Sequence, residues 1–409
     1  MKVTINSESN ISVDNQRNKI IDIINSVDSL NSKYKESLGW WDLDQEANTQ
    51  KLDEINDLAA KIRKIASVLV VIGIGGSNQG ARAVIEALEK RDDFEVIWAG
   101  NNLSSYEAKN VIDSIGDRDF CINVIAKNFK TVEPGVGFRI FRDLLIKKYG
   151  ETYNERVITT GTINSYFEVL SKKEGYTFID FPNELGGRYS LFSNVGLLPI
   201  AFANYDIKAL VEGAKNIASD IKYNEDVINY IAFRTANYSS NLNIEMLSYF
   251  EPRLFRFAKW WMQLDAESEG KDNKGIFPVT ANFSEDLHSI GQFIQSGNPI
   301  LFETFIKINK QSFDIPLLKN NVEDEFDYLN NKTLTEVNKI SEMATIKAHS
   351  SRLPVCVIEV EKLEEFELGQ LMYMYFYVTY ISCVYMDVNP FDQPGVETYK
   401  AWMFEGLKK

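Results

Sequence analysis

The sequence of 409 residues predicts an α/β protein with two doubly wound lobes, mostly parallel sheets, and helical segments at both ends. Short continuous apolar runs alternate with longer stretches of helical periodicity, as in parallel strands joined by crossover helices. The length also exceeds that of most single domains. We expect a helical N-terminal segment (1–65), a first lobe (66–195), a second lobe (196–367) and a helical C-terminal segment (368–409).

The first lobe should begin with a buried parallel strand. Residues 67–74 (SVLVVIGI) form a continuous apolar run that ends in glycines, and a helical pattern follows from Gly80. A further helical stretch is expected at 136–148. The remaining strands of this lobe are predicted at four places: 94–99, 120–126, 157–160 and 177–181.

The second lobe should begin with helical sequence over 195–241. Its strands are predicted at 242–249, 275–281, 302–308 and 354–360, with helical stretches between them. Since no Pro/Gly-rich linker separates the lobes, we expect them to pack together with a site between them.

The longest apolar run, 371–386, is short for a membrane span and contains five tyrosines. We predict a buried helix there. A surface for a partner protein is the less favoured alternative.

Composition and charge limit the classes of partner. The formal net charge of -14 argues against nucleic acid and anionic membranes. Three cysteines (Cys121, Cys356 and Cys383) lie in apolar runs, as expected for free thiols in a reducing cytoplasm. With two histidines and no CxxC spacing, no metal site is expected. The N-terminus lacks the apolar core of a signal peptide, so we expect a cytoplasmic protein.

Glu267 is a candidate catalytic base. Pro252 can open a helix, apolar residues recur at helical spacing over 254–261, and Gly270 should end the helix. Glu267 then lies in the last turn, where the negative end of the helix dipole and partial burial both make a carboxylate a better proton acceptor. A surface glutamate on an amphipathic helix is the alternative.

His288 is a candidate partner for this base. Asn282 or Ser284 should cap a new helix, with Glu285 and Asp286 in its first turn. The acidic neighbours favour the imidazolium ion, whereas the helix N-terminus favours the neutral ring, and the sequence does not decide between them. A structural role also stays open for His288. The second histidine, His349, has no role that we can derive and is expected to be structural.

Two loops of the first lobe are candidates for an anion site. Residues 73–77 (GIGGS) join a strand to a helix, where backbone N–H groups can approach a phosphate and Ser77 can donate. Asn78 breaks the dinucleotide fingerprint, and the Walker pattern is absent. Residues 126–134 (AKNFKTVEP) add two lysines, an amide and a hydroxyl. The alternatives are a glycine turn that only packs and a solvated basic turn.

Five motifs, in order along most of the chain, resemble the glucose-6-phosphate isomerase family: GIGGS (73–77), GGRYSLFSNVGLLP (186–199), QLDAESEGK (263–271), DLHS (286–289) and NPFDQPGVETYK (389–400). The resemblance implies two sugar-isomerase (SIS) lobes and interconversion of glucose 6-phosphate and fructose 6-phosphate through a cis-enediol, in glycolysis and gluconeogenesis. It also implies that no metal or organic cofactor is used, and that a homodimer shares its active sites.

The resemblance further implies a role for each matched residue. Glu267 moves the proton between C2 and C1, and Arg188 stabilises the enediolate. His288 opens the sugar ring with the help of Lys400, and reaches into the neighbouring subunit's site. Contacts to substrate and phosphate are implied for Gly76, Ser77, Lys127, Asn128, Thr131, Gly187 and Gln393.

One loop departs from the family pattern. Ala126, Asn128 and Lys130 stand where hydroxyl residues are usual. We therefore expect the phosphate to be held with fewer hydroxyls and more ammonium charge, so that binding weakens with added salt. Two alternatives stay open: an isomerase for another phosphosugar such as mannose 6-phosphate, and a sugar-phosphate-binding protein without catalysis, which the complete acid–base set disfavours.

Overall fold

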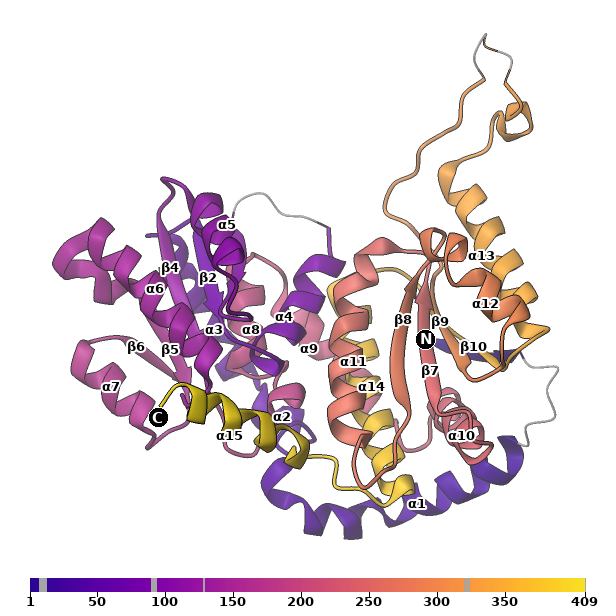
Figure 1. Cartoon of the computed structure of the whole chain (residues 1–409), viewed down its shortest axis with the longest axis horizontal. Coiled ribbons are helices and arrows are strands. Elements are labelled where there is room, and N and C mark those ends of the chain that lie inside the picture. Colours follow the sequence, from indigo (N-terminus) through magenta and orange to yellow (C-terminus); the bar gives the residue numbers. More distant parts are fainter. Residues whose placement is uncertain (7–12, 90–93, 128, 320–321, 323, 409) are drawn as a thin grey trace.

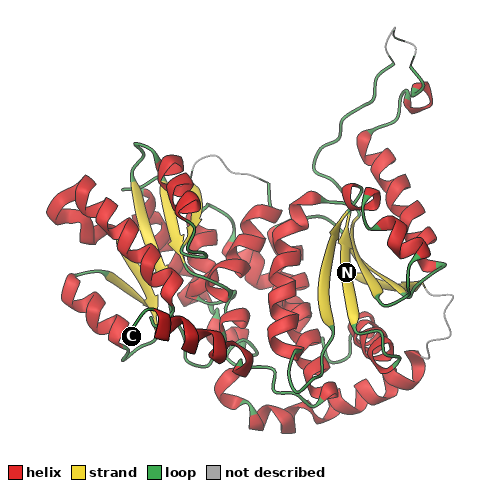
Figure 2. Ribbon diagram, viewed as in Figure 1, coloured by secondary structure: helices red, strands yellow, loops and turns green. Residues whose placement is uncertain are grey.

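The computed structural model describes residues 1–6, 13–89, 94–127, 129–319, 322 and 324–408, and its strands form two five-stranded sheets (Figures 1 and 2). The first sheet is entirely parallel, in the order β3-β2-β4-β5-β6. Its strands are β2 (Val68–Ile72), β3 (Glu95–Ala99), β4 (Phe120–Ile125), β5 (Val157–Gly161) and β6 (Thr177–Asp180). Strands therefore occur at every position predicted for this lobe.

The second sheet has the order β1-β10-β9-β7-β8 and is parallel apart from β1. Its strands are β1 (Lys2–Asn6), β7 (Ile244–Tyr249), β8 (Phe277–Asn282), β9 (Phe302–Ile308) and β10 (Val355–Val360). The four strands predicted here are confirmed. The mixed α/β class with mostly parallel sheets is confirmed as well.

The prediction of a purely helical N-terminal segment is wrong at its start. β1 pairs antiparallel with β10, with Lys2 opposite Glu359 and Asn6 opposite Val355. This strand is short, lies at the edge of the sheet, and has only partly buried or exposed residues, so its sequence carries little apolar signal. The rest of the segment is helical, in α1 (Val13–Lys33), α2 (Leu43–Glu46) and α3 (Thr49–Arg63). The boundaries expected between the four parts of the chain stay a prediction.

Helices cover both sheets and fill the space between them (Figure 1). Those of the first lobe are α4 (Gly76–Ala87), α5 (Ser105–Ile115), α6 (Val132–Tyr149) and α7 (Tyr166–Glu174). The predicted helical stretch 195–241 is divided into α8 (Asn194–Phe202), α9 (Ile207–Ala218) and α10 (Glu225–Ser239). Asp206 and Asn224 cap the second and third of these by accepting backbone N–H groups, which explains the breaks. The remaining helices are α11 (Phe255–Glu269), α12 (Gly291–Ser296), α13 (Leu334–Ser350), α14 (Glu365–Met386) and α15 (Glu397–Gly406).

The predicted buried helix is α14. Its side chains are almost all buried from Leu368 to Cys383, and it packs against α9 and α11 between the two sheets (Figure 1). One hydrophobic core runs through it from Val71 in the first sheet to Phe302 in the second. The two lobes therefore share a core. In the described residues, no helix is long and apolar enough to cross a membrane.

Candidate active site

A cavity of about 610 Å³ lies at the carboxyl ends of β2 and β4, where the order of the first sheet reverses. Ligands of doubly wound proteins bind at such switch points. The first predicted loop lines the cavity with residues 74–77, and the second loop lines it with described residues between 125 and 134. The end of α11 and one face of α15 form the rest of the wall. Of the predicted site residues, the cavity brings together Gly76, Ser77, Lys127, Thr131, Gly187, Arg188, Glu267, Gln393 and Lys400. Asn128 lies outside the described residues.

Glu267 lies in the last turn of α11, as predicted. The helix follows a 3₁₀ turn at Pro252–Leu254 and ends before Gly270, whose N–H donates to the carbonyl of Ala266. The Glu267 side chain is 32% exposed, and it lines the cavity. The carboxylate is thus open to a ligand but is not a fully solvated surface group.

Both carboxylate oxygens of Glu267 are held by amide donors. Gln263 Nε2 donates to Oε1 at 3.3 Å, and Gln393 Nε2 donates to Oε2 at 2.9 Å. Arg188 Nη1 adds a second contact to Oε2 at 3.3 Å. Sequence reasoning missed Gln263, although its place one helical turn before Glu267 is a signal that the two side chains share a face. The donors fix the orientation of a carboxylate that remains free to accept a proton.

Arg188 is a buried cation with a fixed orientation. Its side chain is 1% exposed and lies in a 3₁₀ turn at Gly187–Tyr189. Nε donates to Ser268 Oγ at 2.8 Å, and Nη2 donates to the carbonyls of Pro390 at 2.6 Å and Asp392 at 3.3 Å. Most of its partners are neutral, so much of its positive charge is available to an anion in the cavity.

The close approach of the two glycine turns depends on Gly76. A Cβ atom on Gly76 would lie 1.9 Å from the carbonyl oxygen of Gly187, whereas a Cβ on Gly187 would have no neighbour nearer than 3.8 Å. The crowding was not visible in the sequence because the two turns are far apart along the chain.

The phosphate loops present helix N-termini to the cavity. Ser77 lies in the first turn of α4, and Thr131 precedes α6 but makes no side-chain capping bond to any described residue. First-turn N–H groups therefore remain available, and this is the arrangement that favours phosphate. Lys130 is exposed at the same edge.

Lys127 lines the cavity but is partly used by the fold. Its ammonium donates to the carbonyls of Asn183 at 2.9 Å and Leu185 at 2.8 Å, and burial lowers its pKa. These bonds tie the second loop to the segment before Arg188. The sequence treated Lys127 only as a ligand for phosphate, because side-chain-to-carbonyl bonds over such a distance leave no local pattern.

Lys400 and His288 have different positions. Lys400 projects from α15 into the cavity wall and pairs with Glu397 at 2.8 Å. His288 is exposed and does not line the cavity of its own chain. The predicted cap of its helix is also wrong, since Glu285–His288 is a single 3₁₀ turn and Ser284 makes no capping bond to a described residue. Instead, Asp286 accepts the backbone N–H of Asn282 at 2.7 Å.

A buried ionic cluster supports the end of α11. Arg234 of α10 donates to Glu245 at 2.6 Å, Asp265 at 2.7 Å and Glu269 at 3.0 Å, and all four side chains are at most 1% exposed. Burial raises the pKa of Asp265 to about 8 and also raises that of Glu269. Asp265 and Glu269 flank Glu267 on α11, so the cluster fixes the last turn of the helix that carries the candidate base.

Lys271 joins the end of α11 to the C-terminal segment. It forms an ion pair with Asp392 at 3.1 Å and donates to the carbonyls of Ser268 and Asn389. Burial lowers its pKa. Sequence reasoning missed this residue, although it lies within the motif QLDAESEGK.

The second histidine and the three cysteines lie in the protein interior. His349 is 2% exposed and its Nδ1 lies 2.7 Å from Glu303 Oε2, which confirms a structural position. The three cysteines are free and buried, as predicted. In the described part of the chain, no three His, Cys, Asp or Glu side chains are grouped as a metal site requires.

Comparison with known proteins places these features in a family. The model of the phosphoglucose isomerase family matches residues 49–404. A glucose-6-phosphate isomerase of Listeria monocytogenes is 43% identical over 91% of this chain and 87% of its own. A hypothetical protein of Thermus thermophilus has the same fold, with a TM-score of 0.90 at 23% identity over the whole of both chains. A glucose-6-phosphate isomerase of Chlamydia trachomatis gives a TM-score of 0.76 at 18% identity, over 88% of this chain and 73% of its own. This chain belongs to the phosphoglucose isomerase family.

Proposed function

We propose that this chain interconverts glucose 6-phosphate and fructose 6-phosphate, with Glu267 moving a proton between C2 and C1 of the sugar. The observation that carries the assignment of Glu267 is its carboxylate, oriented by two amides beside a buried arginine and open to a cavity of suitable size. Isomerisation of this kind needs one positioned base and a fixed positive charge near the developing enediolate oxygen.

Each further residue has a task in this reaction. Arg188 stabilises the enediolate, since its guanidinium is held rigidly and needs no reorganisation. The N-termini of α4 and α6, with Ser77, Lys127 and Thr131, bind the phosphate. Gln393 contacts the sugar near the base, and Lys400 assists ring opening from α15.

The assignment is tested by one coupled assay with fructose 6-phosphate, repeated with mannose 6-phosphate. We expect turnover of fructose 6-phosphate to exceed that of the mannose compound. The reverse order would assign the chain to another phosphosugar. We place the reaction in the cytoplasm, which the three buried free thiols support.

Added salt is expected to raise the KM for fructose 6-phosphate several-fold between about 50 mM and about 500 mM, because ammonium groups supply part of the phosphate site. Steady-state kinetics over this range measure the effect, and kcat should change little.

Lys130→Gln should flatten this salt dependence. The matched control is Lys147→Gln, which removes an exposed lysine from the far end of α6. A KM that does not respond to salt would contradict the ammonium-rich site.

We further propose a homodimer in which His288 completes the partner's site. His288 is exposed outside its own cavity. The segment between β9 and α13, which we call the arm (described residues 309–319, 322 and 324–333), carries exposed apolar side chains such as Phe313, Leu318 and Phe326 (Figure 1). An exposed apolar surface of this kind is typical of protein contacts.

Mixing Glu267→Gln and His288→Gln chains should restore activity that neither variant has alone. Random re-association gives about a quarter of the wild-type rate, since about half of the dimers are mixed and each has one intact site. The activity is measured after denaturation and refolding together. If each chain supplied its own histidine, mixing would restore nothing.

A further inference from the structure

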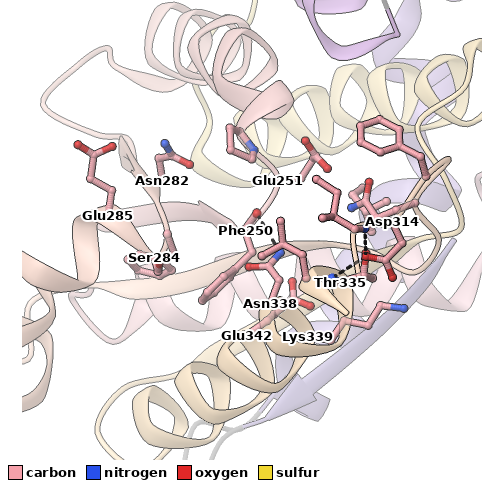
Figure 3. Close-up of a pocket in the computed structure, with 17 residues that line it drawn as sticks. Phe250, Glu251, Asn282, Ser284, Glu285, Asp314, Thr335, Asn338, Lys339 and Glu342 are labelled. Carbon is pink, nitrogen blue, oxygen red and sulfur yellow. Dashed lines mark hydrogen bonds between the residues drawn. The ribbon is translucent and has the colours of Figure 1, made fainter. Parts of the chain in front are cut away.

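A second cavity, of about 450 Å³, lies at the carboxyl ends of β7, β8 and β9 (Figure 3). Its lining begins where each of these strands ends, at Phe250, Asn282 and Ile308. Residues of the arm and of α13 close the other side. In the second sheet β7 lies between β8 and β9, as β2 lies between β3 and β4 in the first. The cavity therefore occupies the switch point of the second lobe, which is the position that the candidate active site occupies in the first.

The cavity contains a buried carboxylate that the fold does not use. Glu342 of α13 is only 4% exposed, yet no hydrogen bond or ion pair joins its carboxylate to any residue that the structure describes. Burial raises its pKa to about 7. The charged groups that act on it are Lys307, Lys339 and Glu359. Lys339 donates to the carbonyl of Asn309 at 2.7 Å instead of to Glu342.

A second unsatisfied acceptor lies beside the cavity. The side-chain oxygen of Asn282 is buried and has no hydrogen-bond donor among the described residues. Buried acceptors in native proteins almost always have a donor. The Asn282 oxygen is closed off from the cavity, so the Glu342 carboxylate is the acceptor that remains for an occupant with an N–H or O–H group.

The walls favour a cation over a neutral ligand. Phe250, Phe283 and Phe313 provide aromatic surface, and Figure 3 shows Glu251, Glu285 and Asp314 around the same hollow. Hydrogen bonds from Thr333 and Thr335 lower the pKa of Asp314 to about 2, so this carboxylate is charged at neutral pH. Aromatic faces together with carboxylates are the surroundings in which proteins bind organic ammonium groups.

We propose that this cavity is a second ligand site, for a small organic cation whose ammonium group donates to Glu342 while its apolar part packs on Phe250 and Phe283. The volume suits a ligand of this size. The site is separate from the candidate active site, since the two cavities share no lining residue. It does not depend on the proposed isomerisation.

Benzylamine is a suitable probe, titrated into the full chain by isothermal calorimetry. We expect one saturable site per chain, which saturating fructose 6-phosphate does not displace. Glu342→Gln should weaken the binding at least about tenfold, the range of one charge-assisted hydrogen bond. Benzyl alcohol, which has the same ring without the charge, should not bind measurably.

Two controls keep the experiment decisive. Glu155→Gln removes an exposed glutamate of the first lobe and should leave benzylamine binding unchanged. Phe313→Leu removes aromatic surface from an exposed wall of the cavity and should also weaken the binding, so it provides a second test if Glu342→Gln does not fold. Absence of saturable binding, or equal binding by the wild type and both cavity variants, would overturn the proposal. Binding that appears only when dimers are dissociated would also overturn it, because a side chain of the second copy would then fill the cavity.

Discussion

Glu267→Gln is expected to lower kcat about 100-fold or more, with little change in the KM for fructose 6-phosphate. Glutamine has nearly the shape of glutamate, and its oxygen can still accept from Gln393 and Arg188. Its amide nitrogen can donate to the unpaired oxygen of Gln263 once that amide turns over. The variant has no carboxylate to accept a proton from carbon. The loss should therefore appear in the chemical step, as measured by coupled assays in both directions.

Glu405→Gln is the matched control for this prediction. It removes an exposed glutamate from α15, close in sequence to cavity residues but outside the lining, and should leave kcat within a few-fold of wild type. Solvent deuterium should enter C1 or C2 of the sugar with the wild type and only slowly with Glu267→Gln. Near-normal turnover of the variant would remove Glu267 from the role of base.

Arg234→Leu is expected to lower the apparent free energy of unfolding by about 3–5 kcal/mol. The guanidinium donates to Glu245, Asp265 and Glu269 in a site without solvent, and its removal leaves three buried acidic side chains without their shared hydrogen-bond donor and positive charge. Urea denaturation, with catalytic activity measured in parallel, tests this. A loss below 1 kcal/mol would show that the cluster contributes little to stability.

The loss of unfolding free energy caused by Arg234→Leu should increase with pH. The folded-state pKa of Asp265 is already raised to about 8 by burial, so folding binds a proton there. A carboxyl whose pKa is raised on folding makes the free energy of unfolding fall as pH rises from its usual pKa to the raised one. Without Arg234 this dependence becomes steeper, and the variant should be closest to wild type near pH 5. Lys109→Met, which breaks an exposed pair with Asp113, should cost well under 1 kcal/mol at any pH.

The secondary structure of both lobes could be predicted because parallel strands are buried on both faces. β2 (VLVVI) and β4 (FCINVI) are buried along their whole length, so their sequences are nearly continuous apolar runs. The end of α11 followed from Gly270, which acts locally. β1 could not be predicted because an edge strand buries little and is fixed by its partner β10.

For the candidate site as well, the sequence predicted one part and the tertiary structure decided the other. The sequence determined which residue types are present, since the motifs around Ser77, Arg188, Glu267 and Lys400 can be recognised locally. Their arrangement was not determined in this way. The tertiary structure alone placed Gln393 on the carboxylate of Glu267, across 126 positions of the chain.

By itself, the sequence determined the family, the strands of the first sheet, four of the five strands of the second sheet and the identity of the proposed base. Only the tertiary structure decided that Gly76 is the crowded glycine, that Lys127 donates to backbone carbonyls, and that Glu342 is buried without a partner. The physical reason is that periodicity and helix caps depend on neighbours within a few residues. Crowding, burial and hydrogen bonding within a cavity depend on segments that only folding brings together.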